Sequence, residues 1–192
     1  MGSEFAGFDV TVVVLAGGTS RRFGADKLVA RWGRGTLLDQ AVSGLPSSWS
    51  ILVVGPERPL SRAVRYAREE PVGAGPAAAV LAGVRACDAD RVVTMPGDSP
   101  FAAQVVQRLA SALVAHQSVV AAGSQPHPLY LGLRATALDR LRGLDPAEWA
   151  HRSARALMSW LDPLHVTVPP GWLADVDTPA DLDSLVRQVP TG

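Results

Sequence analysis

The chain has a single cysteine, no net charge and no long apolar segment. Because Cys87 has no second cysteine to pair with, an internal disulfide is excluded and a reducing compartment is favoured. The 18 basic residues balance the 18 acidic ones, so the net charge indicates neither nucleic acid nor an anionic membrane as a partner. The apolar runs fall far short of the ~20 residues needed to cross a bilayer. These absences favour a cytoplasmic protein, in which a local basic cluster can still bind a small anion.

What the sequence does contain is enough apolar material for one folded domain. The hydrophobic fraction is 47% over 192 residues, and domains commonly have ~100–200 residues. Cys87 lies among apolar residues of a predicted helix and is expected to be a small buried side chain. The opening "MGSEFAG" matches neither a signal peptide nor a myristoylation motif, and "GSEF" is typical of a cloning scar. We therefore expect residues 1–7 to lie outside the fold and residues 8–192 to form one domain.

Strand and helix patterns alternate along the chain. Val10–Leu15 is a continuous valine-rich run, which is typical of a strand buried on both faces of a parallel sheet. Further strands are predicted at Ile51–Gly55, Val64–Glu69, Arg91–Met95, Ser118–Gly123, Pro128–Leu133 and His165–Val168. Helices are predicted after Thr36, at Gly75–Ala86, Phe101–His116, Ala135–Leu141 and Ser153–Leu161, and after Thr178. This alternation predicts a single-domain, three-layer αβα, Rossmann-like α/β fold with a mostly parallel central sheet.

The first predicted strand runs into a basic, glycine-containing loop, "AGGTSRRFGADK". Gly17 and Gly18 have no Cβ, so the backbone can turn there and approach a ligand closely. Ser20 adds a hydroxyl, while Arg22 and Lys27 add positive charge suited to phosphate. Ligands of such sheets bind at the carboxyl ends of the strands, where this loop lies. The pattern therefore favours a nucleoside triphosphate as the ligand over the alternative of a merely solvated loop.

Two familiar phosphate-binding loops are excluded by their absence. The chain has no G-x-x-x-x-G-K-[ST] motif, so the loop is not a P-loop. It also lacks G-x-G-x-x-G, which argues against a dinucleotide-dependent dehydrogenase.

The loop "LAGGTSRRFGADK" resembles the L-A-G-G-x-S-x-R-x-G-x-D-K signature of molybdenum cofactor guanylyltransferases, the MobA-like nucleotidyltransferases. The resemblance continues through "EEPVGAGPAAAV", "VTMPGDSPF", "HPLYLGL", "HRSARALM" and "DVDTPADL", and so spans nearly the whole chain. It implies that the nucleotide is bound by Leu15, Ala16, Gly17, Gly18, Ser20, Arg22, Lys27, Glu70, Gly75, Pro76 and Asp98. Of these, Arg22, Lys27 and Asp98 would be catalytic.

Three aspartates suit a divalent cation that accompanies a triphosphate. Magnesium takes oxygen ligands from one or two carboxylates together with phosphates and waters. Asp98 follows a buried strand at the carboxyl edge of the sheet, and Asp175 and Asp177 point to the same side of an extended segment. The alternatives are a helix cap for Asp98, a task for which Ser99 is better placed, and a polar turn for the other two. We expect Mg²⁺ to be held by Asp98 with Asp177 or Asp175.

The resemblance also suggests residues for the base and for the acceptor. Glu69 or Glu70 can accept the N1–H and N2–H donors of guanine, although either can equally be a surface acid. His127 precedes the predicted strand at Pro128–Leu133, where it faces substrate or simply begins the strand. Arg152 and Arg155 either reach the acceptor's phosphate or share one exposed helix face. Asp181 is different, because it fits the N3 position of a capping box begun by Thr178 and is expected to be structural.

The implied reaction is transfer of GMP from GTP to the terminal phosphate of (molybdenum-)molybdopterin, with release of pyrophosphate, in bis-MGD-type cofactor biosynthesis. Asp175 and Asp177 replace two asparagines common in guanylyltransferases, and D-x-D-T-P occurs in related cytidylyl- and sugar-nucleotidyltransferases. A CTP-dependent molybdopterin cytidylyltransferase or a sugar-1-phosphate nucleotidyltransferase is therefore the alternative, and a non-catalytic nucleotide-binding module a remote one. Transient contacts with other proteins of molybdenum cofactor biosynthesis are also expected.

Overall fold

The first strand, β1 (Val10–Leu15), is an inner strand of the sheet and is buried almost throughout. The computed structural model describes residues 9–18 and 22–187. Val12 and Val14 join the hydrophobic cluster on one face of the sheet, and Val13 joins the cluster on the other. Successive strand residues point to opposite faces, so a run of valines serves both layers at once. The predicted cloning scar at residues 1–7 and the predicted site residue Ser20 lie outside the described residues.

Seven strands form the sheet that the described residues build, in the order β5-β4-β1-β6-β8-β7-β9. Besides β1 they are β4 (Ser50–Val54), β5 (Arg65–Ala67), β6 (Arg91–Pro96), β7 (Ser118–Ala122), β8 (Pro126–Arg134) and β9 (Leu164–Thr167). The pairs β5–β4, β4–β1, β1–β6 and β7–β9 are parallel, whereas β8 is antiparallel to both β6 and β7. The sheet is thus mostly parallel, as the alternating pattern predicts.

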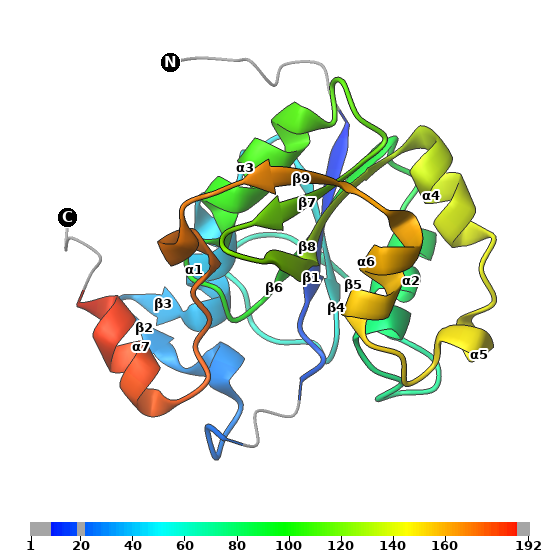
Figure 1. Cartoon of the computed structure of the whole chain (residues 1–192). Helices are drawn as coiled ribbons and strands as arrows, with labels where there is room; N and C mark the ends of the chain where they lie inside the picture. The colour runs from blue at the N-terminus through cyan, green and yellow to red at the C-terminus, as the bar shows by residue number, and fades with distance from the viewer. Residues whose placement is uncertain (1–8, 19–21, 188–192) are drawn as a thin grey trace.

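Helices cover both faces of this sheet (Figure 1). On one side lie α1 (Leu37–Ser43) and α3 (Ala102–Ala112). On the other lie α2 (Pro76–Arg85), α4 (Ala135–Arg142), α5 (Pro146–Trp149) and α6 (Ala154–Leu161). The three-layer Rossmann-like fold predicted from the sequence is confirmed. No helix within the described part of the chain is long and apolar enough to span a membrane.

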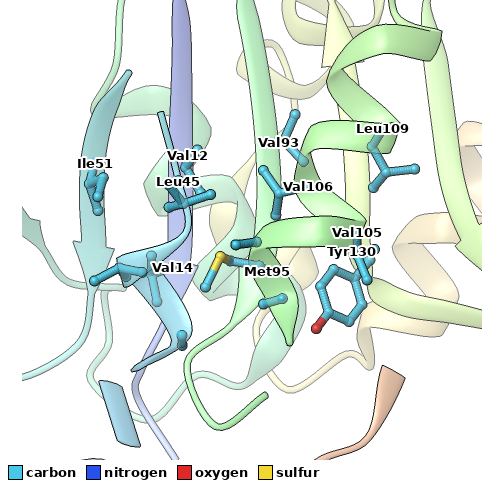
Figure 2. Packing of buried hydrophobic residues seen from close by; sticks show 14 of the residues in the cluster. Val12, Val14, Leu45, Ile51, Val93, Met95, Val105, Val106, Leu109 and Tyr130 are labelled. Atoms are coloured by element: carbon cyan, nitrogen blue, oxygen red, sulfur yellow. The ribbon is translucent and has the colours of Figure 1, made fainter. Parts of the chain in front are cut away.

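The layer under α1 and α3 shows how the apolar pattern becomes a core (Figure 2). Val105, Val106 and Leu109 of α3 pack beside Val93 and Met95 of β6 in one cluster of buried residues. Their i, i+1 and i+4 spacing places all three α3 residues on the sheet-facing side of that helix. Burial of each such side chain contributes about 1.5–3 kcal/mol, so this layer holds β6 and its carboxyl end in place.

A smaller element group closes the carboxyl edge of the sheet. The hairpin β2 (Arg31–Trp32) and β3 (Gly35–Thr36) and the helix α7 (Pro179–Val186) share a small cluster. Trp32 of the hairpin is buried there with Leu37 and Val176, and Leu182, Leu185 and Val186 of α7 pack against them. Figure 1 shows α7 beside β2 and β3, away from the face of the sheet that α2, α4, α5 and α6 cover. The short turns η1 (Lys27–Val29) and η2 (Pro170–Leu173), like the hairpin and α5, are absent from the sequence prediction because each is too short for a periodic pattern.

Several local expectations can now be compared with the structure. Cys87 is buried, as predicted. The capping box formed by Thr178 and Asp181 is present, with both reciprocal hydrogen bonds. Neither Asp98 nor Ser99, the two residues considered as caps of the following helix, caps it. That helix begins at Ala102 without a side-chain cap, because the Ser99 hydroxyl donates to Asp175 instead.

Candidate active site

The end of β1 is fixed by its neighbours on both sides. Gly97 N–H donates to the Leu15 carbonyl (3.0 Å), and Ala16 N–H donates to the Val54 carbonyl (2.8 Å). Gly55 stands against this turn with φ +152°, and a Cβ there would lie 2.6 Å from the Ala16 carbonyl oxygen. Only glycine tolerates both the dihedral angle and the contact. The strand ends of β1, β4 and β6 are therefore packed tightly where the glycine loop begins.

A cavity of about 380 Å³ opens at these strand ends. Gly17 and Gly18 border it on one side, and Gly73, Gly75 and Pro76 border it on the other. Its remaining lining consists of Leu15, Glu69, Ala79, Pro96, Asp98 and Leu129. The cavity therefore brings together most of the residues to which the sequence analysis assigns nucleotide binding, from three segments of the chain. Ala16 is buried beneath the loop.

Of the two glutamates proposed for the base, Glu69 lines this cavity and Glu70 is exposed outside its lining. The Glu69 residue is 6% exposed, and its Oε1 accepts the Gly73 N–H (3.1 Å). A Cβ on Gly17 would lie 3.5 Å from the same oxygen, so Glu69 reaches across to the first loop. The cavity thus has a second carboxylate on its lining besides Asp98, and this one is buried.

The Lys27 ammonium lies between the carboxylates of Asp98 and Asp177. Lys27 begins η1, a turn capped by the Asp26 side chain, which accepts the Leu28 N–H (3.2 Å), while Leu28 itself is buried. From there the Lys27 ammonium contacts Asp98 (2.6 Å), Asp177 (3.3 Å) and the Val176 carbonyl (2.6 Å). Burial opposes the charge on Lys27, but the bonds and charges of the two aspartates outweigh it, so the pKa of Lys27 is raised. The ammonium stays charged.

Asp98 lies just beyond β6, where the sequence analysis expects it. Its carbonyl oxygen accepts the Val176 N–H (3.0 Å), which ties the end of β6 to the segment before α7. Burial raises the pKa of the Asp98 carboxyl, and the hydrogen bond from Lys27 opposes that rise only in part. A buried carboxylate of this kind is stabilised by a neighbouring cation.

Asp175 and Asp177 have different partners. Asp177 is half exposed and pairs with Arg22 (2.9 Å) as well as Lys27. Asp175 accepts the Ser99 hydroxyl and lies 3.5 Å from His127 Nε2. Burial would raise the pKa of Asp175, but the bonds from His127 and Ser99 prevail and lower it. Asp175 is therefore engaged by protein donors, whereas Asp177 faces the loop cations.

Two carboxylates and one backbone carbonyl, and not a larger acidic cluster, are arranged to hold a divalent cation. Within residues 9–18 and 22–187, no three His, Cys, Asp or Glu side chains converge as a metal centre. The oxygens of Asp98, Asp177 and Val176 nevertheless converge on one cation, the Lys27 ammonium. An all-oxygen donor set with two carboxylates suits Mg²⁺, which completes its shell with phosphate and water.

The predicted acceptor residues lie in two places. His127 adjoins Asp175, and its ring contacts Tyr130 edge-on at 5.0 Å between centroids. Arg152 and Arg155 are exposed, at and beyond the turn before α6. That turn packs on the cavity's glycine wall, because the Arg152 carbonyl accepts the Ala77 N–H (3.4 Å) and a Cβ on Gly75 would contact it at 3.7 Å. Arg152 also stacks over Trp149 (5.1 Å).

Arg58 and Asp26 are absent from the sequence analysis. The Arg58 side chain is 6% exposed and donates to Asp26 (2.7 Å), to the Ala16 carbonyl (3.1 Å) and to the Pro56 carbonyl (3.1 Å). It therefore holds the glycine loop from behind. The position of Arg58 after a predicted strand indicates that it lies at the same sheet edge as the loop. Its pairing with Asp26 could not be predicted, because the two residues are far apart in sequence.

Comparisons with known proteins agree with this geometry. The model of the MobA-like NTP transferase domain matches residues 12–166. The "Molybdenum cofactor guanylyltransferase" of Mesorhizobium japonicum is 34% identical over 148 residues, which are 70% of this chain and 71% of that protein. The "Probable molybdenum cofactor guanylyltransferase" of Bacillus thuringiensis is 32% identical over 106 residues, or 51% of this chain and 50% of that protein. The match thus spans about half the length of the Bacillus relative.

A solved structure supports the fold. The crystal structure of molybdopterin-guanine dinucleotide biosynthesis protein A from Archaeoglobus fulgidus superposes with a TM-score of 0.69 and 18% identity. The superposition covers 93% of this chain and 97% of that one. The sheet, the glycine loop and the domain match therefore lead to one conclusion: the chain belongs to the MobA-like NTP transferase domain family.

Proposed function

We propose that this protein is a GTP:molybdopterin guanylyltransferase that acts in bis-MGD-type molybdenum cofactor biosynthesis. One observation carries the proposal. A cavity bordered by Gly17, Gly18 and Gly75 has a buried carboxylate, Glu69, on its lining and the Lys27–Asp98 pair beside it. The cavity can therefore accept one nucleotide, with its base at Glu69 and its polyphosphate at Lys27. The resemblance to proteins named molybdenum cofactor guanylyltransferase supports the choice of acceptor.

The proposed chemistry needs no general base on the protein. The attacking atom is a terminal phosphate oxygen of molybdopterin, and a phosphate monoester, whose second pKa is about 6, is largely ionised at pH 7. That oxygen forms a bond to the α-phosphorus of GTP, and the bond from the α-phosphorus to the bridging oxygen of pyrophosphate breaks. The electron pair leaves with pyrophosphate. Catalysis then consists of alignment and charge neutralisation.

Each basic residue of the loop has a proposed part in that neutralisation. Lys27 binds the phosphates and stabilises the charge that develops on pyrophosphate. Arg22 approaches from the same loop with a planar fork suited to a phosphate group. The backbone at Gly17 and Gly18 offers N–H groups at close range, and Ser20 adds a hydroxyl. Such a set stabilises an anion without taking part covalently.

Asp98 and Asp177 would hold Mg²⁺, and Asp175 would support them from its bonds to Ser99 and His127. When bound, the metal ion supplies Lewis-acid charge neutralisation to the phosphate oxygens. His127, Arg152 and Arg155 are proposed to meet the acceptor, because His127 adjoins Asp175 and the turn that carries Arg152 packs against Gly75 and Ala77. The enzyme would work in the cytoplasm, with transient contacts to other proteins of the same biosynthesis.

Glu69 is the proposed reader of the base. Its carboxylate is buried, lines the cavity and accepts the Gly73 N–H. Guanine offers N1–H and N2–H side by side, and both can donate to one carboxylate. Cytosine lacks that donor pair, so a carboxylate at this position favours GTP.

A cytidylyltransferase is the second candidate, because Asp175 and Asp177 stand where guanylyltransferases commonly have asparagines. The decisive experiment offers GTP, CTP and ATP with Mg²⁺ to the protein, first in calorimetry and then with molybdopterin while pyrophosphate release is measured. We expect GTP to bind most tightly and to support release. Preference for CTP would move the protein to the cytidylyl class. Binding of GTP without pyrophosphate release would leave a nucleotide-binding module and refute the enzymatic proposal.

A further inference from the structure

Lys27 stands where a divalent ion would be held. Its ammonium lies 2.6 Å from Asp98, 3.3 Å from Asp177 and 2.6 Å from the Val176 carbonyl. These are the oxygens that suit Mg²⁺, so one cation already satisfies them. The three oxygens come from two segments that are far apart in sequence, Asp98 after β6 and Val176 with Asp177 before α7. The pairing is therefore a property of the folded protein rather than of a local turn.

The surroundings make this placement stable. The Lys27 side chain is only 12% exposed, so removing its carboxylate partners without replacing them would leave a largely buried ammonium. A free divalent ion brings no anion with it. If it bound Asp98 and Asp177 alone, it would expel Lys27 and leave two cations close together in a partly desolvated site.

We infer that Lys27 closes the acidic site to free divalent ions, so that the metal enters only together with a polyphosphate, as the metal–nucleoside triphosphate complex. This inference rests on the proposed function. The incoming phosphates offer the Lys27 ammonium new oxygen partners on the cavity side, at Gly17 and Gly18. The metal ion can then take Asp98 and Asp177, and every charge keeps a counter-charge during the exchange. The substrate of the enzyme is thus the preformed complex, and a metal-first route is closed.

The first test measures Mn²⁺ binding to the nucleotide-free protein, either by calorimetry or by the paramagnetic resonance signal of free Mn²⁺. Lys27→Met keeps the length of the side chain and removes the charge. We expect it to bind Mn²⁺ on the order of tenfold or more tightly than the unaltered protein. Adding Asp98→Asn to Lys27→Met should abolish that gain, which places the ion at this site. Equal affinity of Lys27→Met and the unaltered protein overturns the inference.

Arg22→Met is the matched control. Arg22 also pairs with Asp177 (2.9 Å), but its side chain is 77% exposed, and the cation paired with Asp98 is Lys27. We expect it to change Mn²⁺ affinity much less than Lys27→Met does. If both substitutions give the same gain, the effect is general charge removal and the inference fails.

The second test uses the unaltered protein, so it does not depend on a variant that folds. Lys27 is the only lysine of the chain, and selective ¹³C labelling of lysine therefore gives one side-chain signal. We expect Mg²⁺ alone to leave that signal in place and Mg²⁺ with GTP to shift it. A shift with Mg²⁺ alone at the same concentration overturns the inference. Neither test involves molybdopterin, so a failure here is distinguishable from failure of guanylyl transfer.

Discussion

Arg58 and Lys27 are two largely buried cations near the first glycine loop, and they have different kinds of partner. Arg58 lies behind the loop and donates hydrogen bonds to Asp26 and to two backbone carbonyls. Lys27 lies in front of it, between Asp98 and Asp177, beside the open cavity. In each pair the cation is largely buried, and the N–O distances are similar, 2.7 Å for Arg58 and 2.6 Å for Lys27. The pairs differ in their position, because Asp98 lines the cavity and Asp26 is not among the lining residues.

The difference teaches that burial and pairing alone do not identify a catalytic cation. The partners of Arg58 are fixed by the fold, because the Ala16 and Pro56 carbonyls cannot leave without moving two strands. Lys27 has carboxylates as partners, and carboxylates can exchange one cation for another. We therefore interpret Arg58 as a structural anchor of the loop and Lys27 as a residue of the reaction.

The largest expected effect is on turnover. Lys27→Met should lower the rate of pyrophosphate release by ~10²–10³-fold, because charge on the phosphates is no longer neutralised. The free energy of unfolding should change by much less than the activation free energy of turnover. Steady-state kinetics with molybdopterin, together with urea unfolding, measures both. A variant with unimpaired turnover would remove Lys27 from the reaction and reverse the comparison.

The next effect falls on stability. Arg58→Ala should destabilise the protein by about 3 kcal/mol, since it leaves Asp26 and the Ala16 carbonyl without their buried partner. Asp26→Asn is the matched variant, because it keeps the shape and removes only the opposite charge, and its loss should be smaller. Urea unfolding measures both. If Arg58→Ala stays fully stable but loses GTP binding, Arg58 is a ligand-binding residue and not an anchor.

A third prediction concerns the base end of the cavity. Glu69→Gln should raise the dissociation constant for GTP about tenfold, because the amide cannot accept both guanine donors. Affinity for CTP should change less. Glu70→Gln is the control, since Glu70 is exposed outside the cavity lining. Calorimetry with the two nucleotides measures the difference. Equal losses for GTP and CTP would mean that Glu69 does not read the base.

The smallest expected effect is the pH-dependent contribution of Asp39 to the stability of the protein. Burial would raise the pKa of Asp39, but bonds from Ser61 and Thr36 outweigh it and lower the pKa below its ordinary value of 3.8. The stability that Asp39 contributes is therefore present above pH 3.8 and is lost as the pH falls through the lower folded-state value. Asp39→Asn should cost about 1 kcal/mol at pH 7 and nothing once Asp39 is protonated.

The measurement for Asp39 is urea unfolding at pH 7 and at the acid end of the transition. The matched control is Asp181→Asn in the second capping box, on α7, which has no buried residue within its described length. Its loss at pH 7 should be smaller, because Asp39 also binds Ser61 of a separate loop (2.8 Å). A difference between Asp39→Asn and the unaltered protein that persists in acid would contradict the assigned role.

Much of the fold was predictable because its elements have strong local patterns. The valine run at Val10–Leu15 and the capping box at Thr178 are readable without any partner. The antiparallel direction of β8 and the hairpin β2–β3 were not, since strand direction depends on distant neighbours and two-residue strands have no period. Ser99 shows the same limit: the local sequence makes it the better-placed helix cap, but its hydroxyl donates to Asp175, which is distant in sequence.

The sequence by itself determined the apolar alternation that builds a three-layer sheet, and the glycines and charges that stand at its strand ends. Those features act over a few residues, so they are visible along the chain. The tertiary structure alone decided that Lys27 meets Asp98 and Asp177, that Glu69 and not Glu70 reaches the cavity, and that Arg58 anchors the loop. Electrostatic pairing depends on distance in space, and only the packed sheet brings residues so distant in sequence to within 4 Å of each other.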